Sequence, residues 1–136
     1  MDVHTSSQRS FNMSRIKGKN TKPEIIIRQF LWQNGFRYRL HYKKLPGKPD
    51  IVFPRRKKVI FIHGCFWHKH DCSYFKWPET NVKFWREKIS GNTKRDTQNY
   101  ESLKECGWEY FIIWECEIKH KLNKLNNSII SFLKEN

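Results

Sequence analysis

The chain has 136 residues, of which 38% are hydrophobic and 15% aromatic, and its formal net charge is +14. This length suits one domain, and the aromatic content argues against a disordered chain. The sequence has no apolar run near the roughly 18 residues of a membrane span, and its first residues lack the apolar stretch of a signal peptide. We therefore expect a cytoplasmic protein with no membrane partner, and the charge favours nucleic acid as its ligand.

Residues 1–20 are polar and basic and cannot bury a core of their own. We predict that they form an arm that is mobile without DNA and becomes ordered on DNA. Arg9, Arg15 and Lys17 are the expected contacts to the DNA backbone. Residues 21–136 are predicted to form a single domain.

The first predicted helix begins after Thr21, whose side chain can cap it while Glu24 completes a capping box. Pro23 fits the first turn of this helix, and Gly35 is placed to end it. Residues 36–41 alternate apolar and basic side chains, which predicts a half-exposed strand.

Two short apolar runs, 50–53 and 59–62, predict two strands joined by a hairpin. The remaining predicted elements are, in chain order, a loop at 63–80, helices at about 81–90 and 93–105, a strand at 108–114 and an amphipathic helix at about 122–133. This order predicts an α/β fold with a central mixed sheet flanked by helices. The helical connection makes strands 59–62 and 108–114 parallel.

Soft metal ligands are concentrated between residues 63 and 72, where three histidines and two cysteines lie within ten residues. Thiolate and imidazole groups together suit tetrahedral Zn²⁺. Cys65, His70 and Cys72 form a compact set, which leaves Cys106 or Cys116 as the fourth ligand.

Topology favours Cys116. Cys65 and Cys116 each follow the carboxyl end of one of the two parallel strands, so both are expected at the same edge of the sheet. Cys106 precedes its strand and is expected at the opposite edge. A site with three cysteines, one histidine and no open position predicts a structural zinc that ties the loop to the sheet.

Asp50 is the only carboxylate between Glu24 and Asp71, in a stretch rich in lysine and arginine. An aspartate after a proline can simply cap a turn, but a carboxylate held among cations can also recruit Mg²⁺ opposite a phosphate. His63 or His68, which the zinc set leaves over, could then take a proton from the attacking water. A nuclease pattern of Pro-Asp followed by Asp/Glu-x-Lys is similar, but residues 57–68 hold no carboxylate and histidine takes the place of the lysine.

The blocks at 45–50 (LPGKPD) and 59–72 (VIFIHGCFWHKHDC) closely resemble those of the very short patch repair endonucleases. Shorter motifs extend the similarity over about residues 3–118: Asn12-Met13-Ser14, the segments at 21–24 and 84–89, Asn92-x-x-x-Asp96, Gly107-Trp108 and the segment at 114–116. The block GCFWH is highly specific to this family.

The resemblance implies a restriction-endonuclease-like three-layer fold and a Mg²⁺-dependent, strand-specific endonuclease. Such an enzyme nicks duplex DNA on the 5′ side of the thymine in a T·G mismatch, which arises when 5-methylcytosine deaminates. The implied partners are therefore mismatched DNA, mismatch-repair proteins and a DNA repair polymerase, with a functional link to a cytosine-5 DNA methyltransferase. The resemblance also implies a monomer.

The same resemblance implies catalytic roles for individual residues. Asp50 and the backbone carbonyl of Ile62 would bind Mg²⁺. His68 would be the general base, with Asp96 orienting it, and His63 would assist at the scissile phosphate.

Three further roles are implied by the family. Glu24 would hold metal-bound water. Zinc would be bound by Cys65, His70, Cys72 and Cys116, in agreement with the topological argument. Because a mismatch costs less to unstack than a proper pair, inserted rings can test for it; the rings that would enter the base stack are those of Phe66, Trp67 and Trp85.

Two alternatives remain open at the level of the sequence. A non-catalytic zinc module that binds nucleic acid would explain the charge and the Cys/His cluster, but not Asp50, His63 and His68 together. A structure-specific nuclease on the same fold, such as a junction resolvase, would differ in its substrate. Mg²⁺-dependent nicking would distinguish the mismatch endonuclease from the non-catalytic zinc module. The choice of substrate would distinguish it from a structure-specific nuclease.

Overall fold

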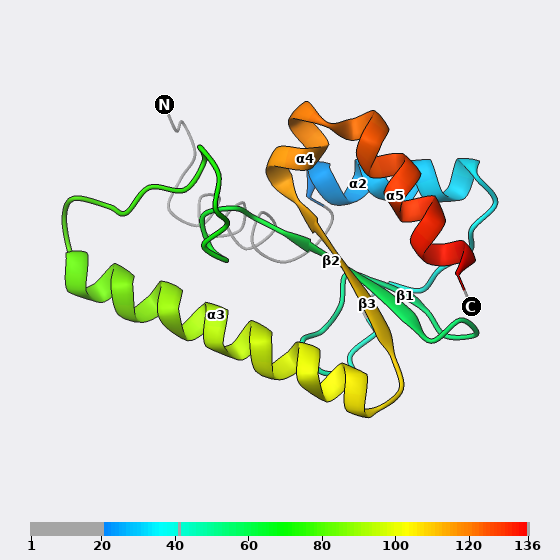
Figure 1. Cartoon of the computed structure of the whole chain (residues 1–136), viewed down its shortest axis with the longest axis horizontal. Helices are drawn as coiled ribbons and strands as arrows, with labels where there is room; N and C mark the ends of the chain where they lie inside the picture. The colour runs from blue at the N-terminus through cyan, green and yellow to red at the C-terminus, as the bar shows by residue number, and fades with distance from the viewer. Residues whose placement is uncertain (1–20, 41, 136) are drawn as a thin grey trace, which may run out of the picture. The chain divides into compact units, whose positions relative to one another are not determined.

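A computed structural model describes residues 21–40 and 42–135 (Figure 1). The chain divides into two compact units, one ending at Phe36 and the other beginning at Arg37. The predicted arm, with Arg9, Arg15 and Lys17, lies outside the described residues, and the prediction of a single domain from residue 21 onward stays a prediction. No helix among the described residues is long and apolar enough to cross a membrane.

The described part of the first unit is built around helix α2 (Lys22–Gln33). Its start follows the predicted capping signal, because the Thr21 side chain accepts a hydrogen bond from the backbone N–H of Glu24 at 3.5 Å. Ile27 and Leu31, one helical turn apart, are fully buried. Gly35 follows the helix with a φ of +82°, a conformation that glycine adopts without strain. The predicted helix is therefore confirmed.

The second unit contains a three-stranded sheet in the order β1-β2-β3. Strand β1 (Ile51–Phe53) pairs antiparallel with β2 (Lys58–His63), and β2 pairs parallel with β3 (Glu109–Trp114). The predicted hairpin and the predicted parallel pair are both confirmed. Their last paired residues, His63 and Trp114, place the carboxyl ends of β2 and β3 side by side.

Helices cover both faces of this sheet, with α3 (Val82–Glu105) on one side and α4 (Glu115–His120) and α5 (Leu122–Lys134) on the other (Figure 1). Val59 and Phe61 of β2 form a buried cluster with Leu103 of α3. On the other face, the ring of Phe111 contacts that of Phe132 in α5, with centroids 5.2 Å apart. The unit is thus an α/β fold with a mixed sheet flanked by helices, consistent with a restriction-endonuclease-like fold.

Two basic side chains from the β1–β2 hairpin hold the end of α5. Arg56 donates to the carbonyl of Leu133 at 2.8 Å, and Lys58 donates to the carbonyls of Phe132 and Glu135. The last carbonyls of a helix have no partner within it and carry partial negative charge, so cations stabilise them. Some of the excess basic residues therefore stabilise the fold rather than bind a polyanion.

Three predictions about secondary structure differ from the structure: the strand at 36–41, the break between helices near residue 91, and the lack of a helix directly after β3. Residues 36–40 do not form a strand, and residue 41 lies outside the described residues; within 36–40, only Arg39 pairs, with Val52. Pro49 and Pro54 flank β1. Because proline has no backbone N–H to donate to a neighbouring strand, these two residues keep β1 short.

The predicted break between two helices near residue 91 is absent, because α3 runs continuously through Gly91. One interior glycine costs only about 1 kcal/mol, which the backbone bonds and packing of a 24-residue helix outweigh. The short helix α4, directly after β3, was not expected.

Candidate active site

Alternation along β2 places His63 on the face of the sheet that α3 covers. Successive side chains of a strand point to opposite faces, so Val59, Phe61 and His63 share one face. Phe61 lies against Tyr100 of α3, with ring centroids 5.5 Å apart. His63 is the next side chain in this row and is buried at the end of the strand, with only 6% of its surface exposed.

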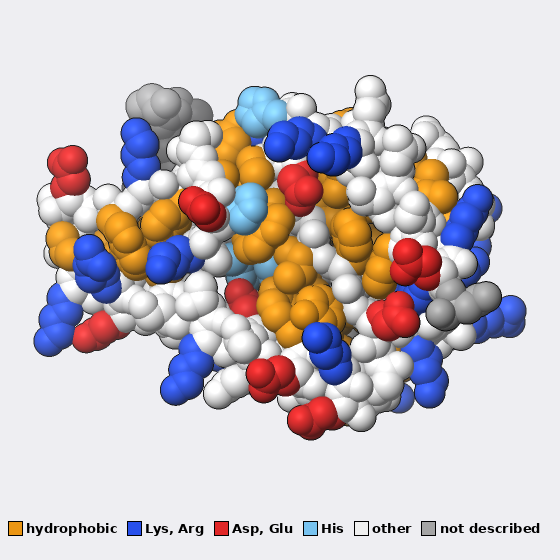
Figure 2. Space-filling model, in the orientation of Figure 1, with side chains coloured by type: hydrophobic (Ala, Val, Ile, Leu, Met, Phe, Trp, Pro, Cys, Tyr) orange, Lys and Arg blue, Asp and Glu red, His pale blue; other side chains and the backbone are white. Residues whose placement is uncertain are grey.

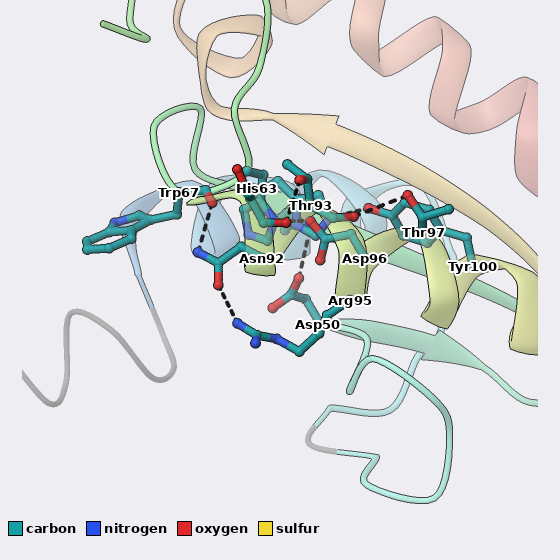
Figure 3. A network of polar contacts seen from close by, with 12 residues as sticks. Asp50, His63, Trp67, Asn92, Thr93, Arg95, Asp96, Thr97 and Tyr100 are labelled. Atoms are coloured by element: carbon teal, nitrogen blue, oxygen red, sulfur yellow. Dashed lines mark hydrogen bonds and ion pairs between the residues drawn. The ribbon is translucent and has the colours of Figure 1, made fainter. Parts of the chain in front are cut away.

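His63 and His68 form a stacked pair between β2 and α3. Their ring centroids are 3.7 Å apart and their planes differ by 13°. Nδ1 of His68 lies 2.5 Å from a carboxylate oxygen of Asp96, and Nε2 of His63 lies 2.6 Å from the hydroxyl of Tyr100. Figure 3 shows Asp50, His63 and Asp96 gathered at this point, beside the ribbon of α3.

The two histidines differ in their electrostatic setting. Burial, together with the neighbouring His68, lowers the pKa of His63 to about 3, so this ring is neutral at physiological pH. His68 instead has a carboxylate at its Nδ1. An Asp that accepts from Nδ1–H leaves the Nε2 lone pair of a neutral imidazole available to take a proton.

Asp50 stands immediately before β1 and is joined to β2. Its backbone N–H donates to the carbonyl of Ile60 at 3.1 Å, and its carboxylate accepts from the backbone N–H of Ile62 at 2.7 Å. Within a strand, the N–H and C=O of one residue point to the same side, so the carbonyl of Ile62 also faces the Asp50 side of β2. The two predicted Mg²⁺ ligands therefore lie on the same side of the strand.

A second cluster forms where β2 and β3 end. The candidate ligand atoms of Cys65, His70, Cys72 and Cys116 all lie within 4.8 Å of one another. Nδ1 of His70 is 3.4 Å from Sγ of Cys116 and 3.7 Å from Sγ of Cys65, and its ring stacks on Trp114 at 4.0 Å. Cys106 is exposed beyond the end of α3. The structure thus brings Cys116, and not Cys106, to the other three residues.

Two groups of donor atoms have the chemistry to bind a metal: the Cys/His cluster, and the Asp50 carboxylate with the Ile62 carbonyl. Three thiols and one imidazole with ligand atoms within 4.8 Å suit a closed tetrahedral zinc site. Burial raises the pKa of Cys65 to about 12 and also raises that of Cys116, and a bound divalent cation would oppose this by stabilising the thiolates. The carboxylate of Asp50 and the carbonyl of Ile62 are oxygen donors, which suit Mg²⁺.

The three aromatic residues expected to enter DNA contact one another. The ring centroid of Phe66 lies 5.3 Å from that of Trp67 and 5.5 Å from that of Trp85, and the two tryptophans are 5.9 Å apart. Trp67 is 40% exposed. On the face seen in Figure 2, histidine side chains lie beside hydrophobic ones, with lysine and arginine side chains spread over the surface around them.

Comparison with known proteins decides the family. Residues 1–74 match the family model described as DNA mismatch endonuclease Vsr. The chain is 39% identical over 134 residues to the DNA mismatch endonuclease Vsr of Escherichia coli, covering 98% of this chain and 86% of that protein. The chain belongs to the Vsr family of DNA mismatch endonucleases.

Other relatives of the chain carry a different description. The type II nicking enzyme V.NmeAIP of Neisseria meningitidis is 48% identical over 120 residues, covering 88% of this chain and 86% of the relative. The type II nicking enzyme V.XorIIP of Xanthomonas oryzae is 43% identical over 117 residues, covering 86% of each chain. Membership of the Vsr family makes the protein an endonuclease that acts on DNA.

The Vsr-family site residues predicted from the sequence fall into two groups. All of them from Asp50 to Cys116 lie in the second unit, where they form the two clusters and the aromatic group described above. Glu24 lies in the first unit, where its buried carboxylate accepts from Arg28 at 2.8 Å, and its role stays a prediction.

Sequence reasoning assigned no role to Asn92, Arg95 or Tyr100. Asn92 donates to the backbone carbonyl of Trp67 at 3.0 Å and accepts from Arg95 at 2.5 Å (Figure 3). The positions 92, 96 and 100 are four residues apart, so they follow one face of α3. The four-residue spacing from Asp96 is the signal that could have found Asn92 and Tyr100, whereas no such signal marks Arg95.

Proposed function

We propose that this protein nicks one strand of duplex DNA on the 5′ side of the thymine in a T·G mismatch. Such a mismatch is the product of 5-methylcytosine deamination, and the nick would start very short patch repair. The observation that carries the proposal is the stacked pair of His63 and His68, each with its own partner on α3, beside Asp50. A neutral histidine, an oriented histidine and a carboxylate are the groups that metal-assisted phosphodiester hydrolysis uses.

In this proposal, Asp50 and the carbonyl of Ile62 would hold Mg²⁺, and the ion would supply positive charge at the scissile phosphate. The short contact between the Asp50 carboxylate and the Ile62 N–H fixes the side chain against β2.

Proton transfer is assigned to His68. Asp96 at 2.5 Å accepts from Nδ1–H of His68, which orients the ring and leaves Nε2 to take a proton from the attacking water. The carboxylate also stabilises the imidazolium that forms. The neutral His63 keeps one N–H with which to donate to a phosphate oxygen.

Recognition of the mismatch is assigned to the aromatic group Phe66, Trp67 and Trp85. Their mutual contacts at 5.3–5.9 Å keep the rings together before DNA arrives, which lowers the entropic cost of inserting them. A T·G pair opposes insertion less than a matched pair does. Zinc on Cys65, His70, Cys72 and Cys116 would anchor the loop that carries Phe66 and Trp67 to the end of the sheet.

The relatives named as type II nicking enzymes support a functional link to a DNA methyltransferase. We further propose mismatch-repair proteins and a DNA repair polymerase as partners in the pathway, and action on DNA in the cytoplasm as a monomer. Residues 1–20, with Arg9, Arg15 and Lys17, would close on the DNA backbone, and Glu24 would hold water at the metal.

The deciding experiment measures nicking on duplexes labelled separately on each strand. Each duplex carries T·G, T·A or C·G at one position, within randomised flanking bases, with Mg²⁺ or with a chelator. We expect one cut, on the thymine strand, only in the T·G duplex with Mg²⁺. Cutting of the matched duplexes at the same rate, or of both strands, would refute the proposed specificity.

A further inference from the structure

Helix α3 presents two polar groups, one turn apart, to the two stacked histidines. Asp96 contacts Nδ1 of His68 at 2.5 Å, and Tyr100, four residues later, contacts Nε2 of His63 at 2.6 Å. Residues spaced by four lie on the same face of a helix, so one helix register sets both contacts. In the proposed function, the contact of Asp96 with His68 orients the base. The contact of Tyr100 with His63 has no role assigned so far.

The ring of Tyr100 is held in place by its neighbours. It stacks on Tyr110 with centroids 4.6 Å apart and planes 13° apart, and it meets Phe61 edge-on at 5.5 Å. Its hydroxyl is therefore presented to His63 by a side chain with little freedom to move. A group fixed in this way can select one state of its partner at low entropic cost.

The direction of the hydrogen bond follows from the available partners. A neutral histidine has one N–H and one lone pair, and a tyrosine hydroxyl can donate or accept. His63 is the hydrogen-bond partner that the described residues offer to the hydroxyl of Tyr100. If Nε2–H donated to Tyr100, the hydroxyl proton would lose this acceptor, and leaving a partly buried donor unpaired is unfavourable. Burial also raises the pKa of Tyr100, which keeps its hydroxyl protonated as a donor.

We propose that Tyr100 is a positioning residue: its hydroxyl donates to Nε2 of His63 and holds the neutral ring as the tautomer protonated on Nδ1. The Nδ1–H is then the donor that His63 offers to the scissile phosphate. The inference rests on the proposed function, in which His63 acts at that phosphate. Asp96 thus leaves His68 with a free lone pair that can accept a proton, and Tyr100 leaves His63 with a free N–H that can donate.

A purely structural role for Tyr100 makes different predictions. Its ring belongs to the apolar layer between α3 and the sheet, and a buried tyrosine generally finds some partner for its hydroxyl. The variant Tyr100→Phe keeps the ring and removes only the hydroxyl. The matched control is Tyr110→Phe, which removes a hydroxyl from the other ring of the same stack.

Three measurements on the full-length, zinc-containing protein test the proposal. They are the affinity for a T·G duplex without Mg²⁺, the rate constant of single-turnover nicking at saturating enzyme with Mg²⁺, and ¹⁵N–¹H spectra of histidine-labelled protein. The His63 signals are assigned by their absence in His63→Gln. We expect Tyr100→Phe to bind as the wild type does and to nick about tenfold more slowly, as removal of one hydrogen bond implies.

The spectra give the decisive readout. In the wild type we expect His63 to be protonated on Nδ1, in Tyr100→Phe a mixture of both tautomers, and in Tyr110→Phe the wild-type pattern. A wild-type ring protonated on Nε2, or an unchanged rate or tautomer in Tyr100→Phe, would overturn the proposal. A wild-type protein that nicks no T·G duplex would refute the proposed function, while the spectra would still decide the tautomer.

Discussion

The contact between His68 and Asp96 offers the sharpest test of the proposed chemistry, through Asp96→Asn. The change preserves the shape of the side chain and removes its charge. The asparagine can still accept from Nδ1–H through its carbonyl oxygen, but without the charge that stabilises an imidazolium. Alternatively, it donates through its NH₂ to Nδ1 and forces the proton onto Nε2, which abolishes the base.

The magnitude follows from the geometry. The two atoms are 2.5 Å apart and the side chains are only 23% and 20% exposed, so solvent screens the pair incompletely. A hydrogen bond to a charged group contributes about 1.5–3 kcal/mol. Loss of this energy in the transition state lowers the rate roughly 10- to 150-fold, and more if the wrong tautomer dominates.

The assay is single-turnover nicking of a T·G duplex, with DNA affinity and zinc content measured in parallel. Glu101→Gln is the matched control, because Glu101 is exposed on the same helix and the change removes one negative charge in the same way. We expect Asp96→Asn to bind DNA at least as tightly as the control and to nick far more slowly. A nicking rate equal to that of Glu101→Gln would show that Asp96 does not orient the base.

Three further predictions concern the metals and the arm. Asp50→Ala should keep DNA binding, since it removes negative charge from a basic protein, but lose nicking in Mg²⁺; near-normal nicking would show that another group holds the metal. Cys116→Ala should release zinc and lower the melting temperature while Cys106→Ala does neither, because Cys116 lies with the other three candidate zinc ligands and Cys106 does not. Equal zinc content in the two variants by elemental analysis would contradict this prediction. Deleting residues 1–18 should weaken binding and nicking of T·G duplexes and reduce the salt dependence of binding by about one unit for each phosphate that the arm neutralises, with zinc content unchanged; an unaltered salt dependence would identify a dispensable tail.

The cluster of Cys65, His70, Cys72 and Cys116 shows what a sequence can predict over a long distance. Cys65 and Cys116 are 51 positions apart, yet the rule that a helical crossover links parallel strands puts both at one edge of the sheet. The prediction needed only the direction of two strands, which their apolar patterns and the helix between them supply. The structure places the Cys116 thiol 3.4 Å from His70 accordingly.

Tyr100 shows what the sequence did not supply. Its partner depends on the register between α3 and β2, which the packing of Phe61 and Leu103 fixes. Side-chain volumes at one interface decide this register, and no local pattern encodes it. Spacing from Asp96 could place Tyr100 on the correct helix face, but not opposite His63.

The continuity of α3 has consequences beyond a corrected boundary. Trp85 and Asp96 lie on the same helix, about 16 Å apart along its axis at 1.5 Å per residue. A break between residues 90 and 93, as predicted from the sequence, would have left this separation to a flexible joint. A single helix instead gives Trp85 and Asp96 one rigid support, and Asn92 ties the backbone of Trp67 to the same helix. Under the proposed function, the parts that enter the base stack and the parts that move the proton are therefore positioned by one element, which reduces the rearrangement needed once the mismatch is engaged.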